Sequence, residues 1–141
     1  MKEGQTINRH VIGIDPGVCT GFAVYDRGGR ALIVVESFPI LEAMAKVLEW
    51  KGQGVELRFE DARLRRWFGK KDREVLQGAG SIKRDCQIWE DFCHLHQIKV
   101  THIPPMDNLT KLNAGQFAKL TGWEGRTNEH GRDAAMLVFG A

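Results

Sequence analysis

Apolar positions in the first 36 residues occur in short runs or alternate with polar ones, which is typical of β-strands. This pattern predicts strands over residues 11–15, 20–25 and 31–36. Pro16-Gly17 predicts a turn after the first strand, with the glycine at a positive φ. Residues 26–29 (Asp-Arg-Gly-Gly) predict a hairpin after the second strand. Three strands joined by such short turns form an antiparallel meander.

Helical spacing replaces this alternation after residue 36. Pro39 marks the start of the predicted helix and the glycines of residues 51–54 mark its end. Its apolar stripe is expected to contain Ile40, Leu41, Met44, Val47 and Leu48. Residues 55–60 alternate again, which predicts a strand with Val55, Leu57 and Phe59 on one face.

Three more helices and one more strand complete the pattern. Helices are predicted over residues 81–96, 113–120 and 129–139, and the strand over residues 98–103. The first of these helices has an apolar stripe made of Ile82, Cys86, Trp89 and Cys93. Asn113 and Gln116 have the spacing of a capping box at the start of the second.

The element order is therefore β-β-β-α-β-α-β-α-α. It predicts a single α/β domain over residues 1–141, in which helices flank a mixed five-stranded sheet. A chain of 141 residues with 43% hydrophobic and 27% charged residues is large enough to form its own core. Its longest apolar runs are too short to span a bilayer, and residues 1–8 lack the apolar stretch of a signal peptide. We therefore expect a cytoplasmic protein without membrane contact.

The three cysteines, Cys19, Cys86 and Cys93, are odd in number and have no paired spacing. They predict reduced thiols rather than disulfides. Cys93 also lies close to His94 and His96 in the sequence. Because neighbouring positions on a helix point about 100° apart and the chain has no second ligand cluster, a zinc site is not expected.

Positive charge is concentrated in one segment, although the formal net charge is only +2. Residues 62–74 contain six basic and two acidic residues. Such a patch can bind phosphates, and its aromatic residues can stack on unpaired bases. The candidate DNA-binding residues here are Arg63, Arg65, Arg66, Trp67, Phe68, Lys70 and Lys71. The alternative is that Trp67 is a core residue and the charges form a solvated face.

Carboxylates follow two strands and also occur on the last predicted helix. Asp15 ends the first strand, Glu60 ends the fourth, and Asp133 lies one helical turn after His130. Sites in α/β proteins form at strand ends and on neighbouring helices. Clustered carboxylates need a cation, and hard oxygen ligands suit Mg²⁺ or Mn²⁺. Taken singly, each of these residues is better explained by a structural role, such as a turn residue or a solvated strand end.

Three stretches of the chain resemble RuvC-type Holliday-junction resolvases, which have the RNase H-like fold. These are V-I-G-I-D-P-G-V-C-T-G-F-A-V-Y-D (residues 11–26), L-R-F-E-D-A-R (57–63) and H-G-R-D-A-A-M-L-V-F (130–139). The resemblance implies that Asp15, Glu60, His130 and Asp133 are catalytic and bind two Mg²⁺ ions, for which Mn²⁺ can substitute. At the position of His130, family members carry either Asp or His.

The same resemblance implies a metal-dependent endodeoxyribonuclease that cleaves branched DNA, in particular four-way junctions. It places Trp67 or Phe68 at the junction centre and Lys111 among the site lysines. Symmetric cleavage requires two sites, so a homodimer is expected, without a nucleotide cofactor. A resolvase this compact would suit a phage acting in the host cytoplasm.

Two other functions stay open from the sequence. A YqgF-like RNase acting on structured RNA also begins with a strand-Asp motif, but that motif usually reads D-x-G and lacks the basic-aromatic segment. A non-catalytic nucleic-acid-binding module with the RNase H-like fold is the second alternative. Asp61 would point to the opposite face from Glu60, and we expect it to support the metal ligands from behind. Trp123 and Arg126 lie in a loop, where they either touch the substrate or cover the last helix.

Overall fold

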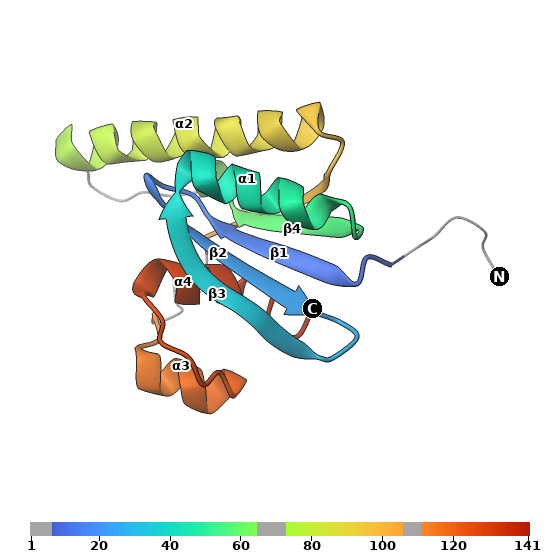
Figure 1. Ribbon diagram of the computed structural model, residues 1–141. Helices are drawn as coiled ribbons and strands as arrows, with labels where there is room; N and C mark the ends of the chain where they lie inside the picture. Colours follow the sequence, from blue (N-terminus) through green and yellow to red (C-terminus); the bar gives the residue numbers. More distant parts are fainter. Residues whose placement is uncertain (1–6, 65–72, 106–110) are drawn as a thin grey trace.

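A five-stranded mixed sheet forms the centre of the molecule in the computed structural model, which describes residues 7–64, 73–105 and 111–141 (Figure 1). The strands lie in the order β3-β2-β1-β4-β5. Their bounds are β1 His10–Asp15, β2 Cys19–Asp26, β3 Ala31–Pro39, β4 Val55–Glu60 and β5 Lys99–Ile103. β1, β2 and β3 pair antiparallel, whereas β4 pairs parallel with both β1 and β5. The predicted meander and mixed sheet are confirmed.

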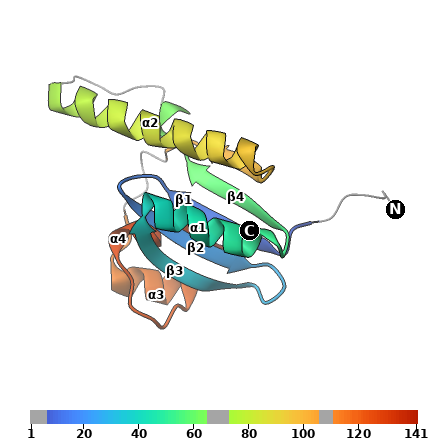
Figure 2. The ribbon, with the colours of Figure 1, turned by 45° about the horizontal axis from the view of Figure 1, so that its top comes forward.

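Helices cover both faces of this sheet (Figures 1 and 2). One face packs against α1 (Ile40–Lys51) and α2 (Arg73–Leu95), and the other against α3 (Ala114–Thr121) and α4 (Glu129–Met136). A short 3₁₀ turn, η1 (Ala62–Leu64), follows β4. The order of elements agrees with the sequence prediction. Among the described residues, every helix is too short or too polar to cross a lipid bilayer.

Alternation along the strands divides the buried residues into two cores. Val55, Leu57 and Phe59 all face α1 and α2, as predicted, and at most 7% of each is exposed. Val11 and Ala23 point the other way and pack with α3 and α4. The same alternation places the intervening residues of β4 on the α4 face.

The apolar stripe of α1 differs from the prediction. Leu41 and Leu48 were expected to face the core, but they are 78% and 40% exposed. Ala43 and Val47 are fully buried instead. Ala43 is small and lets α1 approach the sheet closely. The side of the helix that carries Ala43 and Val47 therefore faces the sheet, and Leu41 and Leu48 point outward. In α2, Cys86, Trp89 and Cys93 are fully buried as expected, whereas Ile82 is 42% exposed.

All three cysteines are free, as the sequence predicted, and Cys86 and Cys93 belong to the core. Burial raises the pKa of the Cys93 thiol to about 12. Burial is also the main cause that raises the pKa of the Cys86 thiol, to about 11. Both side chains therefore stay protonated and pack as small hydrophobic groups.

Local turn geometry also differs from the sequence expectation at Gly17. Gly17 does not take the positive φ that was predicted for it. The hydroxyl of Thr20 instead donates to the carbonyl of Gly17 at 2.8 Å and stabilises the turn between β1 and β2. In the β2–β3 hairpin, the residue with positive φ (54°) is Arg30 rather than a glycine.

The last helix is shorter than predicted, because α4 ends at Met136 rather than at residue 139. The N–H groups of Leu137 and Val138 bond carbonyls three residues back, both at 3.1 Å, which tightens and ends the helix. At α3 the predicted capping box is confirmed. Asn113 accepts from the Gln116 N–H at 2.8 Å, and the Gln116 side chain accepts in return at 3.0 Å.

Two glycines allow α4 to lie directly against the sheet. A Cβ atom at Gly13 would overlap the carbonyl oxygen of Ala134, and one at Gly21 would overlap the carbonyl oxygen of His130. Gly21 is paired with Asp15 across β1 and β2. The position of α4 over the end of β1 therefore depends on the lack of a side chain at these two positions.

We predict that Gly21→Ala lowers the free energy of unfolding by about 1–3 kcal/mol, since α4 must move away from the strands. Urea denaturation measures this change. Gly80→Ala in α2 is the matched control, because a Cβ there meets no atom within 4 Å. In a helix that substitution should add about 0.5–1 kcal/mol. Equal effects of the two substitutions would contradict the close contact of α4.

Candidate functional site

The predicted site residues come from three elements that meet at one end of the sheet. Asp15 ends β1 and Glu60 ends β4, and these two strands are parallel neighbours. Asp15 points to the α4 face, together with Gly13. Glu60 points to the same face, because Phe59 before it packs toward α1 and α2. His130 and Asp133 lie on α4 itself.

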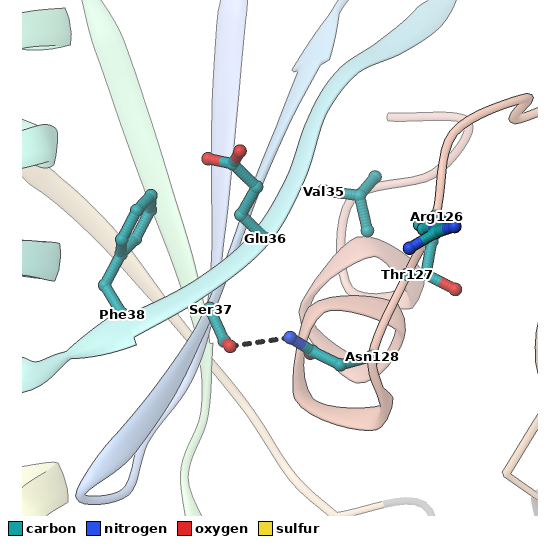
Figure 3. Close-up of a pocket in the computed structure, with 7 residues that line it drawn as sticks. All are labelled: Val35, Glu36, Ser37, Phe38, Arg126, Thr127 and Asn128. Atoms are coloured by element: carbon teal, nitrogen blue, oxygen red, sulfur yellow. Dashed lines mark hydrogen bonds between the residues drawn. The ribbon is translucent and has the colours of Figure 1, made fainter.

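His130 and Asp15 are in direct contact. Nδ1 of His130 lies 3.4 Å from Oδ2 of Asp15, and the two side chains are 47% and 19% exposed. Asn128 fixes the start of α4 by accepting from the Gly131 N–H at 2.8 Å. Its amide also donates to the hydroxyl of Ser37 at 2.7 Å, which joins the helix start to β3 (Figure 3). His130 is thus held over the end of β1.

The acidity of Asp15 is strongly perturbed. Burial, followed by the charges of Asp133 and Glu60, raises its pKa from 3.8 to about 6, while His130 acts in the opposite direction. The carboxyl groups of Asp133 and Glu60 are therefore near enough to disfavour the ionisation of Asp15. A positive charge placed between them would relieve this repulsion.

Lys111 joins the cluster from the segment that precedes α3. Its Nζ atom lies 3.2 Å from Oδ2 of Asp133 and 3.1 Å from Oε1 of Glu129. The hydrogen bond to Glu129 raises the pKa of Lys111, burial opposes it, and Asp133 adds to the increase. The lysine that the family resemblance implied is thus next to Asp133.

The donors suit a hard divalent cation by type, since they are carboxylate oxygens and one imidazole. In the part of the chain that the structure describes, no three acidic, histidine or cysteine side chains are close enough to hold one ion together. The ammonium group of Lys111 supplies the positive charge next to Asp133. Metal ligation by these residues stays a prediction.

Asp61 lies on the opposite face of the sheet, and a supporting role behind the metal ligands stays a prediction. Its carboxylate is 1% exposed and accepts from Arg63 at 2.7 and 2.8 Å. Nδ1 of His102 lies 2.8 Å away. Burial alone would raise the pKa of Asp61, but the Arg63 and His102 hydrogen bonds outweigh it and hold this pKa well below its usual range.

Arg63 takes part in this network, and its side chain is 23% exposed. Besides Asp61, its guanidinium contacts Gln87 at 2.8 Å and Glu90 at 3.4 Å on α2. These contacts join η1 to α2, and DNA binding by Arg63 stays a prediction. The other predicted members of the basic-aromatic segment lie outside the described residues: Arg65, Arg66, Trp67, Phe68, Lys70 and Lys71.

Two concavities of about 350 Å³ each lie along the edge strand β3. The first, drawn in Figure 3, is lined by Val35, Glu36, Ser37, Phe38, Arg126, Thr127 and Asn128. Trp123 lines the second and packs against the core under α4. Neither concavity is lined by Asp15, Glu60, His130 or Asp133.

Sequence reasoning missed three residues that shape the site. Gly21 admits the backbone of His130, Asn128 caps α4, and Glu129 shares Lys111 with Asp133. Asn128 carries a readable signal, since asparagine directly before a helical segment is a frequent N-cap. The role of Gly21 follows only from its pairing with Asp15, which depends on the strand register.

No protein-family model matches this chain, and no curated protein matches it significantly by sequence. Solved structures do match. T. thermophilus RuvC in complex with a Holliday junction substrate superimposes with a TM-score of 0.59 at 19% sequence identity. The match covers 91% of this chain and 89% of that chain. The chain therefore has the RuvC-like, RNase H-like fold that the three sequence stretches had implied.

Replacing Asp15 by asparagine should stabilise the metal-free protein at neutral pH. Because folding raises the pKa of Asp15, its carboxyl favours the folded state below 3.8, and this contribution is lost as pH rises through about 6. Asp15→Asn should therefore gain about 2–3 kcal/mol over the wild type at pH 8 in EDTA, and little at pH 4. Urea denaturation at both pH values measures the difference. A variant less stable than the wild type at pH 8 would contradict this electrostatic repulsion.

Asp61→Asn should have the opposite effect. A depressed pKa means that ionised Asp61 stabilises the fold above its unfolded-state pKa, and that this stabilisation disappears only in strong acid. Loss of the buried charge pair should cost about 2–4 kcal/mol at pH 7. Urea denaturation of Asp61→Asn and the wild type at pH 7 measures this loss of unfolding free energy. An unchanged unfolding free energy would mean that the Asp61–Arg63 contact is not formed in solution.

Proposed function

We propose that this protein is a metal-dependent endodeoxyribonuclease that cleaves branched DNA, with four-way junctions as its preferred substrate. The observation that carries the proposal is the meeting of Asp15, Glu60 and Asp133 with His130 at one end of a RuvC-like sheet. The matched RuvC structure holds a Holliday junction substrate, which supports a junction as the DNA substrate.

Asp15, Glu60, His130 and Asp133 would hold Mg²⁺ ions, two per site, with Mn²⁺ as a substitute. Such ions supply a nucleophilic water and stabilise the leaving oxygen of a phosphodiester. Nδ1 of His130 lies close enough to Asp15 to orient a water or to bind a metal. Lys111 beside Asp133 is placed to neutralise a phosphate oxygen.

Substrate contact and assembly complete the proposal. The basic-aromatic residues Arg65, Arg66, Trp67, Phe68, Lys70 and Lys71 would follow the DNA backbone, with one aromatic ring at the branch point. Because one site cuts one strand at a time, paired cuts across a four-way junction require a homodimer. Sedimentation of the protein with and without junction DNA measures this assembly.

Cleavage of a panel of labelled nucleic acids tests the function. The panel contains four-way, flap, splayed and linear DNA, an RNA–DNA hybrid and a structured RNA, each with Mg²⁺, Mn²⁺ or EDTA. We expect cutting of the four-way junction with either metal and none in EDTA. Asp15→Asn and Glu60→Gln should each lose at least about 100-fold in rate, since even indirect metal contacts are worth 10–100-fold.

Glu49→Gln is the matched control, because this carboxylate is exposed on α1, on the opposite face of the sheet. It should cut at the wild-type rate. Undiminished cutting by Asp15→Asn would overturn the proposed site. Equal cutting of linear duplex would overturn the junction preference, and cutting of RNA alone would assign the protein to the RNases.

A further inference from the structure

In the part of the chain that the structure describes, helices cover only half of the sheet face that carries the acids. α4 packs on β1, β2 and β3. In Figure 1, α3 and α4 lie beneath this half of the sheet, away from β4. On β5, Lys99 and Thr101 are exposed, and Ile103 is partly exposed. Among the described residues, a strip of partly or fully exposed side chains therefore runs along β4 and β5 beside α4, and Glu56 is its buried member.

The parallel register of β4 and β5 orders the residues on this strip. Glu60 is paired with Ile103, Arg58 with Thr101, and Glu56 with Lys99. Two residues along a strand span roughly 6.6 Å. Arg58 thus lies one such step from Glu60, and Lys99 lies two steps away. We call Glu56, Arg58, Lys99 and Thr101 the β4–β5 strip.

Positive charge exceeds negative charge on the strip. The carboxylate of Glu56, only 7% exposed, lies 3.0 Å from Arg27, 3.6 Å from Lys99 and 3.7 Å from Arg58. Three cations thus surround one anion. Arg27 makes the shortest of these contacts, and it also donates to the carbonyls of Asn8 at 2.8 Å and Ala141 at 3.3 Å.

Arg27 alone can balance the negative charge of Glu56, so Arg58 and Lys99 are two additional positive charges. Their side chains are 27% and 69% exposed, and each contacts Glu56 only at the longer distances. An arginine fork can bind two phosphate oxygens, a lysine acts as a point charge, and a threonine hydroxyl can donate to a phosphate. The strip thus offers donors that complement a polyanion.

We propose that the β4–β5 strip binds the phosphodiester backbone of the DNA strand on one side of the candidate site. This inference rests on the proposed function and names a DNA contact outside the four site residues and the basic-aromatic segment. The strip is continuous with Glu60 through Arg58, so one strand can reach both. Glu56 holds Arg58 and Lys99 in place while Arg27 neutralises it.

Binding measured in EDTA, where no cutting occurs, tests the strip apart from catalysis. Arg58→Gln, Lys99→Gln and the double variant are compared with the wild type by fluorescence anisotropy on a labelled four-way junction, from low to moderate salt. Each lost phosphate contact should reduce the slope of log affinity against log salt by about 0.9. The double variant should bind roughly tenfold more weakly at low salt.

Two controls separate charge from structure. Lys46→Gln removes a cation from α1, on the opposite face, and should leave the slope unchanged. Arg58→Lys keeps the charge and should retain most of the slope. Thermal unfolding measures whether the variants fold. We expect them to fold, because the contact of Arg27 with Glu56 stays in all of them.

If the folded double variant keeps the DNA affinity and the salt slope of the wild type, DNA binding by the β4–β5 strip is overturned. This holds even if the wild type cuts junctions efficiently. In that case Arg58 and Lys99 only neutralise Glu56. A reduced slope in a protein that cuts none of the substrates would support the strip while overturning the proposed nuclease activity.

Discussion

The close contact between α4 and strands β1 and β2 determines whether a site can exist here at all. Gly13 and Gly21 leave room for the carbonyl groups of Ala134 and His130, so the helix lies directly on the strand backbone. Because Gly21 is paired with Asp15, this contact also brings His130 to 3.4 Å from the Asp15 carboxylate. The core between the sheet and helices α3 and α4 therefore depends on this contact. Assembly of the acid cluster depends on the same contact.

Neighbouring carboxylates in this chain have opposite electrostatic environments. Glu60 is directed toward Asp15, whose pKa is raised by burial and by the other acids. Asp61 is directed toward Arg63 and His102, whose hydrogen bonds lower its pKa in spite of burial. In the first set, neighbouring negative charges raise the pKa of Asp15, whereas the second is a network of opposite charges that joins η1 and β5 to α2. The pleat of β4 separates these two roles.

Much of the fold was predictable because strand alternation, helical periodicity and the Asn113 capping box are local signals. The positions of three candidate site residues were predictable from local signals. Strand ends locate Asp15 and Glu60, and helical spacing locates His130. Other features depend on contacts between distant segments. The outward rotation of Leu41 follows from how α1 packs on the sheet, and the side-chain contacts of Arg63 follow from partners on α2. Neither carries a signal in its own neighbourhood.

The glycine contacts of α4 also affect how genetic screens of this protein are read. A side chain at Gly13 or Gly21 would overlap backbone atoms of α4, so these substitutions displace α4 before they change any chemistry. A mutational scan scored by activity alone would rank these positions with Asp15 and His130. Abundance measured in parallel would separate the two groups, because loss of a glycine depletes the folded protein whereas loss of Asp15 does not.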